Sequence, residues 1–389
     1  MNLNRFGPVS EWLARLHAFA IVASLVLLAA PLSAASDERQ VYAGTVGAAR
    51  VVMELERVRE AGSDDLTGRY FYRKYRLDIG LHGKQAGDVM TLESRTTGDR
   101  MTLRKTGAGL SGVLTTKDAR RVAVRLSPLI TDGPGKRGVQ AGSDDLSRYE
   151  REQLADLGFV AGKLVKAGPR TAREWREPVS GIALFRIESG YSEPMLATIN
   201  AALERHHWQQ VSQWFTCEGY DGAPGMEISE ARAPYLGDDH VSYAWFANWS
   251  CAGTAHPDFG TQGHTFDAHT GRELTLEDML YLGDGPIPEA DSSEFYRYRS
   301  EVFAPRIVAI LGRLYPAEMK PDDGEPAEDR CDYADPSVWD FPSWYLTPDG
   351  LYLGAYFARV QRPCDEPDWS VIPWHNLTWR KRAPSAANH

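Results

Sequence analysis

The sequence lacks the short motifs that mark several large enzyme classes. It contains neither the G-x-S-x-G motif of nucleophile-elbow hydrolases nor the G-x-x-x-x-G-K-[ST] motif of P-loop NTPases. The acidic run "PDDGEPAEDRCDYADP" lacks the D-x-D-x-D-G spacing of an EF-hand calcium loop. Any catalytic function must therefore rest on residue patterns that are less specific than these motifs.

Cysteine is scarce and confined to the second half of the chain, at Cys217, Cys251, Cys331 and Cys364. No C-x-x-C pair is present, which argues against a zinc site built from these thiols. An even number in an oxidising compartment favours two disulfides, for which three pairings are open. Sequential pairing is the simplest, and it would close two loops of nearly equal length, each stabilising the fold by roughly 3–4 kcal/mol.

Long hydrophobic runs are also missing, except near the N-terminus. The run "AFAIVASLVLLAAPL" follows Arg5 and Arg15 and precedes the small residues "SAAS". This order predicts a signal peptide over residues 1–35 with cleavage near Ala35, and hence a periplasmic or secreted protein. No lipobox cysteine is present, so a lipoprotein is not expected. An uncleaved N-terminal anchor is the alternative interpretation of this run.

Charge is divided unevenly along the chain. The whole chain carries a net charge of −10, but residues 36–170 carry +6. Residues 171–389 contain 17 basic and 34 acidic residues, a net charge of −17. An exported region of this charge disfavours nucleic acid as a partner and favours a cationic protein.

The hydrophobic pattern predicts an α+β protein with several parts. In the first half, short alternating segments separated by turns predict an antiparallel β-meander that closes into a small barrel or sandwich. Within it, residues 69–81 ("RYFYRKYRLDIGL") alternate as one half-buried strand. The expected parts are a signal peptide over 1–35, a β-rich module over 36–130, a linker with a short helix over 131–180, a disulfide-braced domain of antiparallel sheet and packed helices over 181–379, and a basic tail over 380–389.

The second half alternates helices with hairpins. Residues 192–214 predict an amphipathic helix with Ser192 as N-cap, and one of His206 and His207 should face solvent. A second helix over residues 301–315 should begin or kink at Pro305. Hairpins are indicated over residues 264–276 and 344–357, the latter by a Pro-Asp-Gly turn.

The stretch "SCAGTAHPDFGTQGHTFDAHTGRE", residues 250–273, holds the candidate metal ligands His256, Asp258, His264 and His269. In a strand His264 and Asp267 would lie on opposite faces, and His269 would lie in the turn. Zinc motifs such as H-E-x-x-H use helical spacing instead. Asp267 with Thr270 has the spacing of an Asx or ST turn that fixes the register of a hairpin. We therefore expect a structural loop and hairpin with no metal and no cofactor. A site in which His256 and Asp258 meet His264 across the loop is the alternative.

Four segments occur in an order that resembles a known family: a helix with "TIN", "SCAGTAHPD", "TFDAHTGRELTLEDML" and "WYLTPDGLYLGAYF…WSVIPWHNL". Residues 182–377 thereby resemble the C-terminal domain of RsiV-type, lysozyme-responsive anti-sigma factors, which also accompanies polysaccharide deacetylase domains. An inserted Thr254 and the two cysteine pairs depart from the family pattern. The segment "YAGTVG" in the first half is similar to a β-module of bacterial envelope proteins. The resemblance implies an α+β fold with a sensing or accessory role.

The acidic run lies close to "RPCDEPDW" if Cys331 pairs with Cys364. Carboxylates beside aromatic residues are typical of a surface that attracts and holds a basic partner. The predicted partner-binding residues are Asp322, Asp323, Glu325, Asp329, Asp365, Glu366, Asp368 and Trp369.

Together, these patterns favour a non-enzymatic exported binding protein of the bacterial envelope. We expect it to bind or inhibit a cationic peptidoglycan hydrolase of the lysozyme type, with no nucleic acid and no cofactor. The alternative is a metal-dependent hydrolase that acts on envelope polysaccharide through the four candidate ligands.

Overall fold

The structure is a computed structural model that describes residues 39–58, 64–129, 145–220, 222–232, 234–320 and 330–377. The expected signal peptide and basic tail lie outside these residues. The described chain is α+β, as the sequence predicts.

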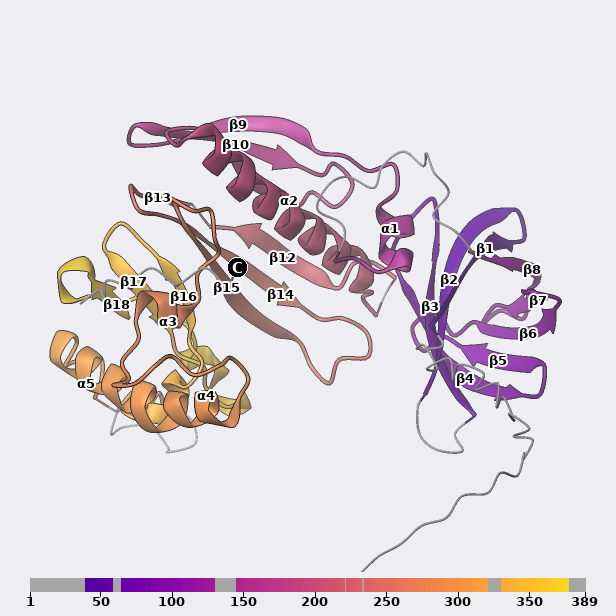
Figure 1. Ribbon diagram of the computed structural model, residues 1–389. Coiled ribbons are helices and arrows are strands. Elements are labelled where there is room, and N and C mark those ends of the chain that lie inside the picture. Colours follow the sequence, from indigo (N-terminus) through magenta and orange to yellow (C-terminus); the bar gives the residue numbers. More distant parts are fainter. Residues whose placement is uncertain are drawn as a thin grey trace, which may run out of the picture. The chain divides into compact units, whose positions relative to one another are not determined.

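The first eight strands form a closed antiparallel barrel, in which each strand pairs with the next and β8 returns to β1 (Figure 1). They are β1 (Gln40–Val46), β2 (Ala49–Arg57), β3 (Asp65–Tyr72), β4 (Ile79–Ala86), β5 (Val89–Glu93), β6 (Arg100–Thr106), β7 (Gly109–Thr115) and β8 (Arg121–Pro128). Large apolar side chains fill the interior, among them Leu92, Met101 and Leu103. The antiparallel meander is therefore confirmed, and of its two expected forms the closed barrel is the one present.

Residues 69–81 do not form the single strand that their alternation predicts. Strand β3 ends at Tyr72 and β4 begins at Ile79, with a turn between them. In this turn the amides of Tyr75 and Arg76 donate to the carbonyl of Tyr72, at 2.9 and 2.8 Å. Arg76 adopts a φ of 63°, and Tyr75 is 63% exposed rather than part of a buried face. A local turn here outweighs a period-2 pattern that continues across it.

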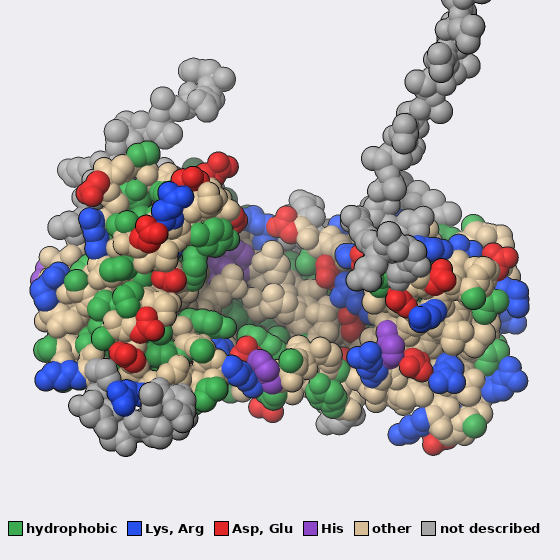
Figure 2. Space-filling model, turned by 90° about the horizontal axis from the view of Figure 1, so that it is seen from below, with side chains coloured by type: hydrophobic (Ala, Val, Ile, Leu, Met, Phe, Trp, Pro, Cys, Tyr) green, Lys and Arg blue, Asp and Glu red, His purple; other side chains and the backbone are tan. Residues whose placement is uncertain are grey.

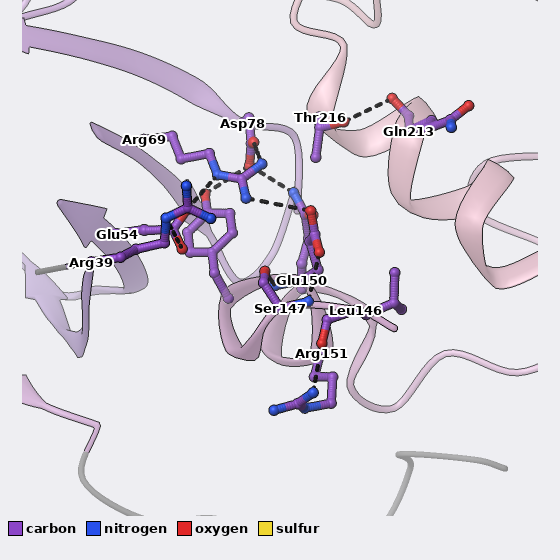
Figure 3. Close-up of polar contacts among 12 residues, drawn as sticks. Arg39, Glu54, Arg69, Asp78, Leu146, Ser147, Glu150, Arg151, Gln213 and Thr216 are labelled. Atoms are coloured by element: carbon purple, nitrogen blue, oxygen red, sulfur yellow. Dashed lines mark hydrogen bonds and ion pairs between the residues drawn. The ribbon is translucent and has the colours of Figure 1, made fainter. Parts of the chain in front are cut away.

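A buried ionic cluster joins the barrel to helix α1 (Arg148–Leu154) (Figure 3). The guanidinium of Arg69 forms ion pairs with Glu54 at 2.9 Å and with Asp78 at 3.3 Å. The Tyr149 hydroxyl donates a hydrogen bond to Asp78 at 2.7 Å. Burial raises the pKa of Asp78 to about 7, in opposition to the positive charge of Arg69.

The barrel also contacts the last turn of helix α2 (Glu193–Thr216) and the segment that follows it. The amide of Asp78 donates to the carbonyl of Phe215 at 2.9 Å. The Glu218 carboxylate accepts hydrogen bonds from the amide of Gly80, at 2.9 Å, and from the hydroxyl of Thr96 at 2.5 Å. Three hydrogen bonds therefore attach the barrel to the second half.

Strands β9 (Val160–Ala167), β10 (Arg170–Arg176) and β11 (Ala183–Ser189) form a three-stranded antiparallel sheet in the order β11-β10-β9. The range assigned to the linker from the sequence therefore contains two strands of this sheet as well as α1. Helix α2 (Glu193–Thr216) packs on β11 through a core that includes Leu184, Ile199 and Leu203.

Helix α2 begins after Ser192 and has Pro194 in its first turn, as predicted. The expectation that His206 or His207 faces solvent is wrong. His207 is fully buried and stacks on Phe159 with ring centroids 3.9 Å apart. The His206 side chain is only 11% exposed. The reason is that α2 lies between two sheets (Figure 1): His206 faces Tyr243 and His207 faces Phe159, whereas the exposed side of the helix carries Ala197, Ala201 and Gln213.

The second sheet contains β12 (Met226–Ala231), β13 (Tyr235–Leu236), β14 (His240–Trp249) and β15 (Asp258–Asp267). Strand β14 pairs with β15 along its whole length and with β12 and β13 on its other edge. A last sheet, in the order β16-β17-β18, contains Ser343–Leu346, Gly350–Gly354 and Val371–Pro373. The predicted hairpin at Pro348-Asp349-Gly350 is present as β16 and β17.

Helices cover the last sheet. They are α3 (Leu276–Met279), α4 (Ser293–Tyr298), the π-helical turn Arg299–Phe303, α5 (Ala304–Leu314) and 3-10 turns at Pro336–Trp339, Arg359–Cys364 and Trp374–Asn376. Pro305 lies in the first turn of α5, directly after the π-helical turn, so the predicted start or kink coincides with this change of helix type. Phe303, Leu311, Trp339 and Leu353 share one core with the sheet.

Both disulfides follow the sequential pairing predicted from the sequence. They join Cys217 to Cys251 and Cys331 to Cys364. In the described ranges, no helix is long and apolar enough to cross a membrane.

Candidate functional site

The hairpin after β15 brings Glu273 back beside His264. Strand β15 ends at Asp267, and Glu273 forms an isolated bridge with the end of that strand. The Asp267 carboxylate accepts hydrogen bonds from the amides of His269 and Thr270, both at 2.8 Å. These bonds form the predicted Asx turn, and they fix which residues of the two arms face each other.

Helix α2 contributes His206 to the same place. The Nδ1 atom of His206 lies 2.9 Å from the Tyr243 hydroxyl on β14. Tyr243 is the cross-strand partner of His264, and their rings stack with centroids 4.9 Å apart. The rings of His206 and His264 are 4.1 Å apart. Two imidazoles and a phenol therefore pack together between the helix and the sheet.

The Glu273 carboxylate lies next to both imidazoles. Its Oε1 atom is 2.7 Å from Nδ1 of His264, and its Oε2 atom is 3.5 Å from Nε2 of His206. The two histidine side chains are 9% and 11% exposed, whereas that of Glu273 is 41% exposed. We call His206, His264 and Glu273 the histidine–glutamate cluster. In the part of the chain that the structure describes, no other three His, Cys, Asp or Glu residues place ligand atoms within 4.8 Å of one another.

The surroundings of the cluster shift the pKa values of two of its groups, and these shifts set which of them is charged at neutral pH. Although burial acts to raise it, the hydrogen bonds with His206 and His264 hold the pKa of Glu273 at about 2. Burial lowers the pKa of His264, in opposition to its hydrogen bond with Glu273. Burial also raises the pKa of Tyr243 well above its ordinary value. At neutral pH the cluster thus contains an ionised carboxylate, a neutral His264 and, beside it, a neutral phenol.

The other three predicted ligands do not join His264. Each has a partner elsewhere: His256 Nδ1 contacts the carbonyl of Pro257 at 3.0 Å, Asp258 accepts from Arg362 at 2.6 Å, and His269 contacts Asp239 at 3.0 Å. The four ligands on which the alternative hydrolase function depends are therefore not brought together.

The predicted partner-binding residues have different surroundings. Asp322, Asp323, Glu325 and Asp329 lie outside the described residues. Asp365 accepts a hydrogen bond from the amide of Phe357 at 2.6 Å, and Glu366 accepts two from Thr261 at 2.6 Å each. Trp369 packs among other rings, 5.1 Å from that of Tyr333. Of the described members, only Asp368 is exposed.

An exposed aromatic group lies on α4 and just before β16. Tyr296 and Phe341 are each 50% exposed, and their rings are 5.7 Å apart. The ring of Phe295 lies 6.3 Å from that of Phe341. We call Phe295, Tyr296 and Phe341 the aromatic platform. It rests on the buried guanidinium of Arg299, which is 5.6 Å from the Phe341 ring and ion-paired with Glu277 at 2.7 Å.

Five exposed carboxylates lie close to the aromatic platform in the sequence, with the exposed Arg297 among them. The acidic rim consists of Asp284, Glu289, Asp291, Glu294 and Glu301, all exposed, of which Asp284 is ion-paired with Arg306 at 3.5 Å. The Tyr296 hydroxyl donates to Asp291 at 3.4 Å, which connects the rim to the platform. Figure 2 faces the helices α4 and α5, and hydrophobic, acidic and basic side chains lie side by side over this lobe.

No protein-family model matches the chain, and neither does any curated protein. His264 was predicted as a candidate ligand from the sequence, but its partners His206 and Glu273 were not. A signal for Glu273 was available, because the Asp267 turn sets the two arms of the hairpin against each other. His206 could not be found in this way, since no local pattern places α2 on the sheet.

Proposed function

We propose that this chain is an exported, non-enzymatic binding protein of the bacterial envelope that captures a cationic protein. The leading class of partner is a peptidoglycan hydrolase of the lysozyme type. The observation that carries this proposal is the aromatic platform with its acidic rim. Half-exposed aromatic rings among carboxylates combine the residue types that anchor an interface with those that attract a basic surface.

The aromatic platform is held in place before any partner arrives. Arg299 stacks under Phe295 at 5.2 Å and under Phe303 at 4.7 Å, and its ion pair with Glu277 is buried. Rings that are already ordered lose little conformational entropy on binding. The platform is therefore suited to act as an anchor rather than as a flexible loop.

The charge of the second half supports the same proposal. Residues 171–389 carry a net charge of −17. Such a field speeds the approach of a cationic protein, and salt weakens it over about 8 Å at physiological strength. The resemblance of residues 182–377 to a lysozyme-responsive family agrees with this class of partner. Asp365 and Glu366 serve as internal hydrogen-bond acceptors, so we assign attraction to the acidic rim instead.

The test is binding of the full mature chain to a basic lysozyme on a biosensor surface. Replacing Tyr296 and Phe341 by alanine should weaken affinity at least about tenfold, because interface aromatics contribute about 1–2 kcal/mol each. Tyr75→Ala is the matched control, since it removes a ring of similar exposure, 63%, from the barrel. Equal affinity of all three proteins would exclude this face, and no binding by the wild type would exclude this class of partner.

A further inference from the structure

We propose that the histidine–glutamate cluster is a binding site for one divalent first-row transition metal ion of the zinc type. The ligands are Nε2 of His206, Nδ1 of His264 and a carboxylate oxygen of Glu273. This inference does not depend on the proposed function, because the cluster and the aromatic platform are different sets of residues.

The spacing of the three ligand atoms suits a tetrahedral ion. Metal–ligand bonds of about 2.0–2.1 Å in a tetrahedron place neighbouring ligand atoms roughly 3.3 Å apart. The Glu273 carboxylate lies 3.5 Å from Nε2 of His206 and 2.7 Å from Nδ1 of His264. All three ligand atoms are within 4.8 Å of one another. The 3.5 Å pair already has about this spacing, the 2.7 Å pair must open by about 0.6 Å, and the nitrogens of the two imidazoles lie no more than 4.8 Å apart, so side-chain adjustments bring the three atoms to bonding positions around one ion.

The donor set also matches the chemistry of such an ion. Two imidazole nitrogens and one carboxylate oxygen form a common three-ligand set for zinc and related divalent metals. The Nδ1 atom of His206 is 2.9 Å from the hydroxyl of the fully buried Tyr243. A partner on the second ring nitrogen orients an imidazole so that its first nitrogen faces a metal. Tyr243 supplies this orientation for His206.

The cluster is more than one ordinary hydrogen bond between a histidine and a glutamate. Two imidazoles that are about nine-tenths buried approach to 4.1 Å and share a single carboxylate. Without a metal, the Glu273 carboxylate is the polar partner of both Nδ1 of His264 and Nε2 of His206. A cation between the three groups satisfies both rings at once. The side chain of Glu273 is 41% exposed, which leaves a path for the ion and for a water molecule as fourth ligand.

The scaffold holds the ligands of the site close together. His206 comes from α2, and the Cys217–Cys251 disulfide connects the residue after α2 to the loop between β14 and β15. His264 lies on β15, and the Asx turn of Asp267 fixes Glu273 relative to it. A site whose ligands are positioned by a helix, a strand and a cross-link loses little entropy when it binds an ion.

The proposal is tested by titrating Zn²⁺ into the full mature chain, purified without a histidine tag and treated with a chelator. Calorimetry should detect one ion per chain with a dissociation constant below about 1 µM. Glu273→Gln and His206→Gln should each weaken binding at least about 100-fold, because each removes one of three ligands. His269→Gln is the matched control, since this histidine lies on the same hairpin but contacts Asp239.

Nitrogen-15 spectra of the imidazoles test the site in the unaltered protein, whether or not the variants fold. Zn²⁺ should shift the ring nitrogens of His206 and His264 and leave those of His269 unchanged. Absence of binding to the wild-type chain would overturn the proposal. Binding that Glu273→Gln leaves intact, or shifts confined to other histidines, would overturn it as well.

Discussion

The barrel and the second half of the chain are stabilised in different ways. The barrel has one closed ladder of eight strands around an apolar core, and its residues include no cysteine. The second half contains three smaller sheets with helices packed between and over them, and it has both disulfides. The histidine–glutamate cluster and the aromatic platform both occur in the second half, where elements of different kinds meet. Both candidate sites thus lie where a helix packs beside a sheet, rather than in the closed barrel.

The largest loss of unfolding free energy is expected on breaking the ionic cluster that joins the barrel to α1. Among the described residues, Arg69→Met removes the only close cation of the buried Asp78 and leaves Glu54 with Arg39 alone, 3.9 Å away, which should lower the free energy of unfolding by about 3–5 kcal/mol. Urea denaturation measures this change. The control is Arg100→Met, whose ion pair with Glu93 is exposed and should contribute almost nothing. Similar losses in both variants would mean that the contribution of an ion pair to the free energy of unfolding does not depend on its burial.

Removal of a disulfide should destabilise the second half and leave the stability of the barrel unchanged. Replacing Cys331 and Cys364 by serine opens a loop whose ends are 33 residues apart. The second half should lose about 3–4 kcal/mol of stability on the chain-entropy model. Hydrogen exchange followed by mass spectrometry should report faster exchange around the last sheet and unchanged protection in the barrel. Loss of protection throughout the barrel would show that the two regions unfold as one unit.

Two carboxylates should give the regions opposite responses to pH. The pKa of Asp78 is raised by burial from 3.8 to about 7, so its contribution to stability is full below pH 3.8 and declines as the pH rises to 7. The pKa of Glu273, despite its burial, is lowered by His206 and His264 from 4.5 to about 2. Its contribution is full above pH 4.5 and is lost as the pH falls to 2.

The variants Asp78→Asn and Glu273→Gln measure these two responses. The difference in unfolding free energy between wild type and Asp78→Asn should fall as the pH rises from 4 to 7. The difference between wild type and Glu273→Gln should fall as the pH decreases below 4.5. Slopes of the same sign would contradict the assignment of burial to one carboxylate and hydrogen bonding to the other.

The smallest effect on stability is expected at the aromatic platform. Tyr296 and Phe341 are half exposed, so replacing either by alanine should cost less than about 1 kcal/mol of unfolding free energy. Thermal unfolding of each variant checks this value. A loss as large as that expected for a core ring, about 3–5 kcal/mol, would identify the platform as part of the core rather than as a surface.

Local patterns predicted much of this fold. Alternation with short turns predicted the antiparallel meander, Pro348-Asp349-Gly350 predicted the last hairpin, and near-equal spacing of the cysteines favoured the correct disulfides. The prediction for residues 69–81 was wrong because alternation alone contains no information on where a strand ends. Hydrogen bonds to the carbonyl of Tyr72 decide that point.

The candidate site could be predicted only in part, because its members come from separate elements. The turn of Asp267 was recognised, and it places Glu273 beside His264. The helical pattern around His206 showed an amphipathic segment, but it could not show that a second sheet covers the other side of α2. Packing of one element on another depends on the whole chain, and it brings His206 to Glu273.

If the negative charge of the second half attracts a cationic protein, the rate of association must depend on the charge of that partner. The association rate constant of the full mature chain is measured with a basic lysozyme and with the same lysozyme after acetylation of its lysines, over a range of salt concentrations. For the basic form the rate should fall at least about tenfold as salt rises, and acetylation should remove most of that dependence. Equal rates for the two forms at low salt would contradict the claim.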